Sequence, residues 1–97
     1  MRTLKIHEGA RREAAQATVW YAERSLSVAG RFRDELLACF SHAAASPQRY
    51  PSYLHGTQRI LLKDFPYFIV FLDWRDEVHI VAVAHAKRRP GYWLKRI

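Results

Sequence analysis

The apolar residues of this chain follow two periods, one typical of strands and one typical of helices. Leu4 and Ile6 alternate with polar neighbours, and this period-2 pattern predicts a first strand. The next segment, from Glu8 to Arg24, is rich in good helix formers. One narrow stripe at helical spacing runs along it and consists of Ala10, Ala14, Ala17 and Tyr21. Glu13 and Arg24 lie off this stripe, so we expect an amphipathic surface helix.

A second helix is predicted from about Val28 to Ala45. Its apolar stripe recurs at spacings of 3, 4, 4 and 3 residues and consists of Ala29, Phe32, Leu36, Phe40 and Ala43, widened by Leu37 and Ala44. Cys39 lies near the stripe and is expected to be a small core residue. Either Ser25 or Ser27 can cap this helix. The short joint between the two helices predicts an antiparallel helical hairpin.

Three strand-like runs follow a loop that extends from Pro47 to Gly56. They cover residues 58–63, 67–72 and 78–85, and the gaps between them suit hairpins. The run 67–72 has no polar face, which indicates a middle strand. The order β-α-α-β-β-β predicts an α+β fold in which the helical hairpin packs on one face of an antiparallel sheet. The opposite face can stay partly open to water.

Composition limits the class of protein. The 97 residues, 49% hydrophobic and 26% charged, fit one globular domain over residues 1–97. No stretch approaches the roughly 18 apolar residues of a membrane span. The first ten residues alternate charged and apolar types, unlike a signal peptide. A single Cys excludes an internal disulfide and a Cys-rich zinc site, so we expect a cytoplasmic protein without a metal or cofactor.

The net charge of +7 favours an acidic partner, although a basic surface without a dedicated partner would give the same total. The excess is concentrated in residues 85–97, which contain no acid. This tail interleaves cations with aromatic side chains in Lys87, Arg88, Arg89, Tyr92, Trp93, Lys95 and Arg96. The pattern suits single-stranded RNA, because cations hold phosphates and aromatic rings stack on bases. Alternatively, the aromatic residues pack on the sheet and the cations remain solvated.

Other residues offer weaker candidates for chemistry. His85 titrates in the range needed for general acid or base catalysis, although a histidine at a strand end is more often structural. Arg59 and Lys63, four apart on one predicted strand, share a face and could join Arg88 around a phosphate, or simply solvate an edge strand. No metalloprotease motif, phosphate-binding loop or serine nucleophile elbow is present.

Together these segments resemble the RelE/ParE superfamily of toxins from bacterial type II toxin-antitoxin systems. The similarity covers nearly the whole chain, and its most specific elements are Phe65-Pro66-Tyr67 and the tail. The further carriers are Ala10 to Trp20-Tyr21, Arg31-Phe32, Glu35-Leu36, Ser46-Pro47, Tyr50-Pro51, Val83-Ala84-His85, Arg88-Arg89-Pro90, Tyr92-Trp93 and Arg96. The superfamily fold is two N-terminal helices packed on a twisted antiparallel sheet.

The tail is most similar to the ParE, or plasmid-stabilisation, branch. That branch implies a toxin that inhibits DNA gyrase without being an enzyme and is neutralised by an acidic antitoxin. Its target-binding residues would be Lys87, Arg88, Arg89, Tyr92, Trp93 and Arg96. The RelE branch instead implies an endoribonuclease that cuts mRNA on the ribosome, with Arg59, Lys63, His85, Arg88 and Tyr92 as its loosely matched catalytic set. A basic nucleic-acid-binding module without toxicity is a third interpretation.

We expect the tail to be required for toxicity and to be separable from the folded domain when the chain is cut after Ala86. The reason is that five cations and two aromatic residues follow the last predicted strand.

Overall fold

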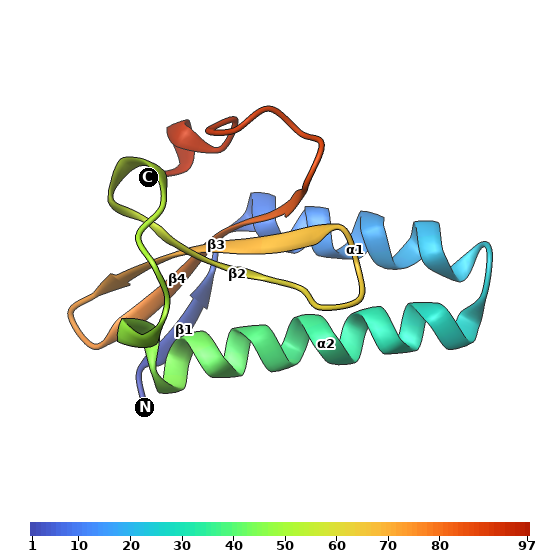
Figure 1. Cartoon of the computed structure of the whole chain (residues 1–97), viewed down its shortest axis with the longest axis horizontal. Helices are drawn as coiled ribbons and strands as arrows, with labels where there is room; N and C mark the ends of the chain where they lie inside the picture. The colour runs from blue at the N-terminus through green and yellow to red at the C-terminus, as the bar shows by residue number, and fades with distance from the viewer.

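The computed structural model describes residues 1–97, which form four strands and two long helices (Figure 1). The order is β1 (Thr3–Ile6), α1 (Glu8–Ala22), α2 (Leu26–Ala45), β2 (Gln58–Leu61), β3 (Tyr67–Trp74) and β4 (Glu77–His85). Short 3-10 turns occupy Pro47–Arg49, Leu54–Gly56 and Leu94–Arg96. The predicted α+β order is therefore confirmed. Neither helix combines the length and the apolar character needed to cross a membrane.

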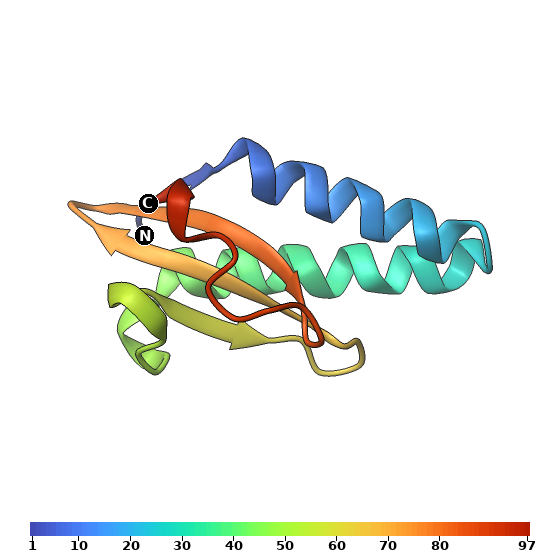
Figure 2. The same cartoon turned by 90° about the horizontal axis from the view of Figure 1, so that it is seen from above.

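Side chains satisfy free backbone groups where both helices begin. His7 Nδ1 accepts a hydrogen bond from the Gly9 amide at 2.9 Å, one residue before α1 starts. Of the two serines considered for α2, Ser25 is the cap, because its Oγ accepts from the Val28 amide at 3.2 Å. The helices then run antiparallel, as the short joint between them predicted (Figure 2).

The four strands form one mixed sheet in the order β1-β4-β3-β2. β3 is an interior strand, as its apolar sequence predicted, and its pairings with β2 and β4 are antiparallel. The expectation of a wholly antiparallel sheet is wrong at one pairing, because β1 runs parallel to β4. The helical hairpin returns the chain to the start of β1, where the Arg2 amide bonds Ala44 O at 3.0 Å. β2 then runs in the same direction as β1. Because each of the two following hairpins reverses the chain, β4 runs in that direction as well.

Three strand boundaries differ from the sequence expectation, the start of β4 by one residue only, since β4 begins at Glu77. β2 ends at Leu61, so Lys63 is not in the strand but in the loop that follows. There the Lys63 and Asp64 amides donate to Glu35 of α2 at 2.5 and 3.0 Å, which satisfies backbone groups that the sheet does not pair. β3 extends to Trp74 and meets β4 through a tight turn at Arg75 and Asp76. Both turn residues have positive φ, 51° and 63°, as a two-residue hairpin loop of type I′ requires.

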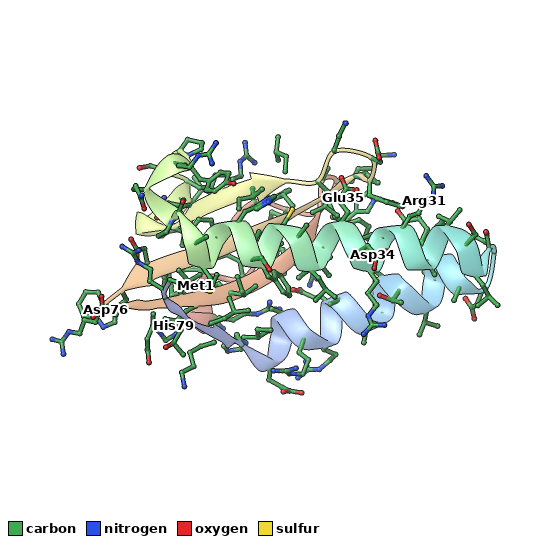
Figure 3. The ribbon with its side chains drawn as sticks, turned by 90° about the horizontal axis from the view of Figure 1, so that it is seen from below. Met1, Arg31, Asp34, Glu35, Asp76 and His79 are labelled. Carbon is green, nitrogen blue, oxygen red and sulfur yellow. The ribbon has the colours of Figure 1, made fainter.

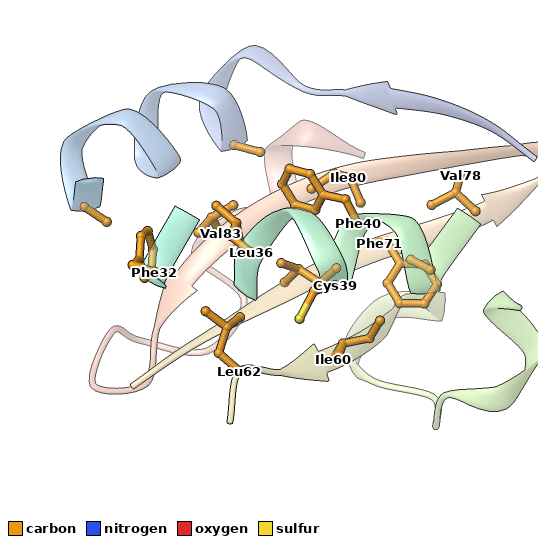
Figure 4. Close-up of a cluster of buried hydrophobic side chains, with 14 residues drawn as sticks. Phe32, Leu36, Cys39, Phe40, Ile60, Leu62, Phe71, Val78, Ile80 and Val83 are labelled. Carbon is orange, nitrogen blue, oxygen red and sulfur yellow. The ribbon is translucent and has the colours of Figure 1, made fainter. Parts of the chain in front are cut away.

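The main core lies between the helical hairpin and one face of the sheet (Figures 3 and 4). The predicted stripes of both helices supply much of it. Ala10 and Ala17 of α1 are buried, as are all five principal stripe residues of α2. Cys39 is also part of this core, whereas Leu37 remains 46% exposed and contributes little. Burial, followed by the nearby charge of Glu35, raises the pKa of the Cys39 thiol to about 11.

A second cluster covers the face of the sheet that the sequence left partly open. The C-terminal tail crosses the sheet on the side opposite α2 (Figures 1 and 2). Trp93 of the tail is 1% exposed and joins five buried residues of β3 and β4: Phe68, Val70, Val81, Ala82 and Ala84. Tyr53, from the loop before β2, and Tyr92 pack against this cluster. The expectation of an open face is therefore wrong, because the tail itself provides the missing layer.

Candidate target-binding surface

A single carboxylate on α1 holds the C-terminal tail in place. Glu13 Oε1 accepts hydrogen bonds from the Val83 amide at 3.0 Å and from Arg96 Nη1 at 2.9 Å. Glu13 Oε2 accepts from the Tyr92 hydroxyl at 2.7 Å, from Arg96 Nη2 at 3.0 Å and from Arg88 Nη1 at 3.1 Å. We call Glu13 and these four partners the Glu13 cluster. It connects α1, β4 and three positions of the tail.

Arg96 is the best-anchored cation of the cluster. It forms a two-pronged ion pair with Glu13, its Nη1 also donates to Val81 O at 3.1 Å, and its side chain is only 19% exposed. The hydrogen bond with Glu13 raises the pKa of Arg96, against the opposing effect of burial. The guanidinium lies over Gly9, where an added Cβ would be 2.5 Å from Arg96 Cζ. The glycine near the start of α1 therefore provides the space for this arginine.

Tyr92 acts as a fixed hydrogen-bond donor. Burial, with the hydrogen bond and the charge of Glu13, raises the pKa of Tyr92 well above its ordinary value. Its hydroxyl therefore stays protonated at neutral pH. One face of its ring is covered by Arg88, whose Cζ lies 3.7 Å from the ring centroid. This environment suits a structural anchor better than a group that must gain and lose a proton during catalysis.

The tail thus divides into buried anchors and exposed cations. Trp93 lies in the second core cluster, so direct contact with a target does not fit its position. Tyr92 and Arg96 are half-buried and bound to Glu13. In contrast, Lys87, Arg88 and Arg89 are exposed in the turn that follows β4. Of the six expected target-binding residues, these three have the surface that a partner can reach.

The structure does not assemble the expected catalytic set. Arg59, on β2, stacks over Tyr53 and Phe68, with its Cζ 4.3 and 5.1 Å from their ring centroids. Lys63 lies beside Glu35 in the loop after β2. Arg59 lies on the face of the sheet that the tail covers, whereas His85 packs with Tyr67 in the groove beside α1, so these residues do not share a face of the sheet.

His85 and Arg88 instead line a groove between α1 and the ends of β3 and β4. The groove has a volume of about 440 Å³ and is lined by Glu13, Gln16, Ala17, Trp20, Tyr21, Pro66, Tyr67, Val83, His85 and Arg88. His85 Nδ1 accepts a hydrogen bond from the Lys87 amide at 3.0 Å. The rings of His85 and Tyr67 pack edge to face, with their centroids 5.0 Å apart. Trp20 stands 50% exposed at the groove. The arrangement offers aromatic and aliphatic walls together with the Arg88 guanidinium and the Glu13 carboxylate.

Glu13 is the residue that the sequence pattern did not identify. It lies off the alanine stripe, yet its side chain is only 10% exposed. A signal was present, because Glu13 is three residues after Ala10 and four before Ala17 and therefore lies next to the stripe. A helical carboxylate in that position, with an acid-free arginine tail elsewhere in the chain, indicates a buried ion pair.

Comparison with known proteins agrees with this architecture. Residues 4–90 match the family described as ParE toxin of type II toxin-antitoxin system, parDE. A solved structure described as the chromosomal ParDE TA system from P. aeruginosa superposes with a TM-score of 0.78. It covers 90% of this chain and 98% of its own, at 15% sequence identity, and so supports the fold alone. No curated protein sequence matches the chain significantly.

Proposed function

The chain belongs to the ParE toxin family of type II toxin-antitoxin systems, and from that membership we propose that it inhibits DNA gyrase and is neutralised by a cognate acidic antitoxin. The observation that carries the proposal is the division of the tail. Trp93, Tyr92 and Arg96 fix its path across the sheet, while the turn Lys87–Arg89 presents three cations to solvent. Such a rigid, basic turn can bind an acidic surface of a protein target.

The rival interpretation, a ribosome-dependent endoribonuclease, finds less support in the geometry. A nuclease of this kind needs cations around the scissile phosphate and a group that moves a proton. Arg59 and Lys63 are held elsewhere, and the hydroxyl of Tyr92 is occupied as a hydrogen-bond donor to Glu13. Of the five residues of the expected catalytic set, only His85 and Arg88 line the groove. These placements favour the binding of a protein over the cleavage of RNA.

Two assays of the intact chain separate the interpretations. Induction without the antitoxin should produce filamentous cells with a DNA-damage response if gyrase is the target. Purified chain should inhibit supercoiling by purified gyrase and leave ribosome-bound mRNA intact. Cut transcripts with unimpaired supercoiling would establish the nuclease instead. Normal growth and neither activity would favour a binding module without toxicity.

The role of the basic turn requires a matched control. One variant replaces Lys87, Arg88 and Arg89 by alanine, and the control replaces three exposed cations on other elements, namely Lys5, Arg12 and Arg49. Both variants lose three charges, so a general effect of net charge would weaken gyrase inhibition equally in both. We expect only the Lys87–Arg89 variant to lose inhibition. Equal losses, or none in that variant, would remove the turn from the mechanism.

A further inference from the structure

The Glu13 carboxylate receives one more hydrogen bond than its acceptor sites accommodate. A carboxylate offers about four lone-pair sites, two on each oxygen. Oε1 accepts two donors, the Val83 amide and Arg96. Oε2 accepts three donors, which are Tyr92, Arg96 and Arg88. One of the donors on Oε2 can therefore leave without depriving Glu13 of a partner.

Arg88 is the donor that is free to leave. Its hydrogen bond to Glu13, at 3.1 Å, is the longest of the five, and it is the only one that Arg88 makes through its side chain. The Arg88 side chain is 53% exposed, against 19% for Arg96, which makes three hydrogen bonds. With one carboxylate and two guanidinium groups, the Glu13 cluster also carries a net charge of +1. It can accept a second anion.

The groove beside Arg88 indicates what that anion is attached to. Its walls include Trp20, Tyr21 and Tyr67, and Arg88 is the one arginine or lysine that lines it, beside the Glu13 carboxylate. A nucleic-acid backbone binds through several cations spaced along successive phosphates, which this groove does not supply. One planar guanidinium next to an apolar hollow instead fits one carboxylate next to one apolar side chain. Both groups are available on the surface of a protein.

We propose that Arg88 exchanges Glu13 for a carboxylate of the target protein, whose neighbouring apolar side chain enters the groove against Trp20. The proposal rests on the proposed function, since it names the group that the toxin recognises on its protein target. No covalent bond changes. Arg88 leaves Glu13 Oε2 and pairs with the incoming carboxylate, while Val83, Tyr92 and Arg96 keep Glu13 fully bonded. The tail therefore keeps its path when the target binds.

Thermal unfolding tests the exchange without any target. Arg88→Ala should melt no more than about 5 °C below the wild type, because an exposed ion pair and an exposed stacking contact with Tyr92 contribute little to stability. Arg96→Ala should melt well below both, since it leaves Glu13 and Val81 O short of donors in a half-buried site. Equal destabilisation by the two variants would show that Arg88 is a fixed part of the Glu13 cluster and would overturn the proposal.

Inhibition of gyrase supercoiling tests the recognition. Arg88→Ala and Trp20→Ala should each raise the half-inhibitory concentration about tenfold or more, and Arg88→Lys should recover only part, because an ammonium lacks the bidentate fork. The matched control is Trp74→Ala, which removes another exposed tryptophan, 59% accessible, from the turn end of β3 and should change nothing. Full inhibition by Arg88→Ala or by Trp20→Ala would overturn the proposal.

A titration with a small probe separates failure of this inference from failure of the proposed function. The dipeptide N-acetyl-Phe-Glu-amide carries the expected pair of groups, and its binding is followed by the NMR signals of the Trp20 indole and the Arg88 guanidinium. Both signals should shift in the wild type and the indole should stay in place in Arg88→Ala, whether or not gyrase is inhibited. No shift at millimolar dipeptide, or an equal response to adenosine monophosphate, would overturn the exchange with a protein carboxylate.

Discussion

Replacement of Trp93 by alanine tests whether the tail is part of the core or an appendage. The Trp93 side chain is 1% exposed and fills the second cluster between β3, β4 and Tyr53. Burial of a tryptophan removes about 150–250 Å² from water, which corresponds to roughly 4–6 kcal/mol at 25 cal/mol per Å². Measured substitutions of this kind cost about 3–5 kcal/mol, because the cavity relaxes only in part. We therefore expect Trp93→Ala to lower the free energy of unfolding by about 4 kcal/mol.

A loss of that size is easily measured in a chain of this length. Domains of about 100 residues shift by roughly 4–8 °C for each kcal/mol, so Tm should fall by about 15–30 °C. Urea and thermal unfolding followed by far-ultraviolet circular dichroism avoid the change in tryptophan fluorescence. Trp74→Ala is the matched control, because Trp74 is 59% exposed and should cost less than about 1 kcal/mol. If Trp93→Ala unfolded no earlier than Trp74→Ala, the tail would not be a structural layer.

Three further predictions concern the Glu13 cluster, the core and the antitoxin. Gly9→Ala should destabilise the protein because the new Cβ displaces Arg96. Gly30→Ala, in α2, should stabilise it by about 0.5–1 kcal/mol in melting experiments, because a Cβ added there meets no atom within 4 Å beyond its own stretch of helix. The pKa of Cys39 is raised from 9.0 to about 11, so at neutral pH its thiolate fraction should be about 100-fold lower than that of an ordinary thiol. A thiol-specific reagent should therefore label Cys39 in the native protein at least about 100-fold more slowly than it labels an exposed cysteine. Fast labelling would contradict the burial of Cys39. Binding of the chain to the product of the adjacent reading frame can be followed by stopped flow. The association rate should fall about tenfold or more from low to physiological salt, while the dissociation rate changes little. An association rate that does not depend on salt would argue against charge steering.

Hydrophobic spacing predicted the layer that the two helices form with the sheet. The α2 stripe from Ala29 to Ala43 is buried throughout, because a repeat of three and four residues can only be satisfied by one helical face. β3 was recognisable as an interior strand for a similar reason. The parallel pairing of β1 was not predictable from a strand of four residues, since its direction relative to β4 follows from where the helical hairpin returns the chain.

The second layer could not be predicted in the same way, because the tail has no regular period. Tyr92 and Trp93 are adjacent in sequence, yet one donates to Glu13 and the other enters the core. A solvated binding segment would have the same aromatic and basic composition as a tail that packs on the sheet. The carboxylate of Glu13, which holds the tail in place, is what identifies the packed arrangement. Arg88 and Arg96 are equivalent as residue types but differ in exposure and in number of hydrogen bonds, which depend on tertiary structure.

The proposed dual role of the tail, in packing and in target recognition, determines how loss-of-function variants of this toxin must be interpreted. A cut after Ala86 removes the basic turn together with Trp93, Tyr92 and Arg96, so it deletes a layer of the core and leaves Glu13 with only the Val83 amide. The expectation that such a truncation leaves a folded domain does not agree with this packing. Loss of toxicity on truncation would then report unfolding and say nothing of the target. Only substitutions in the exposed turn Lys87–Arg89, with melting temperature measured beside activity, separate recognition from stability. The same criterion applies to Glu13, whose replacement would release Tyr92 and leave the Arg96 side chain with only its hydrogen bond to Val81 O.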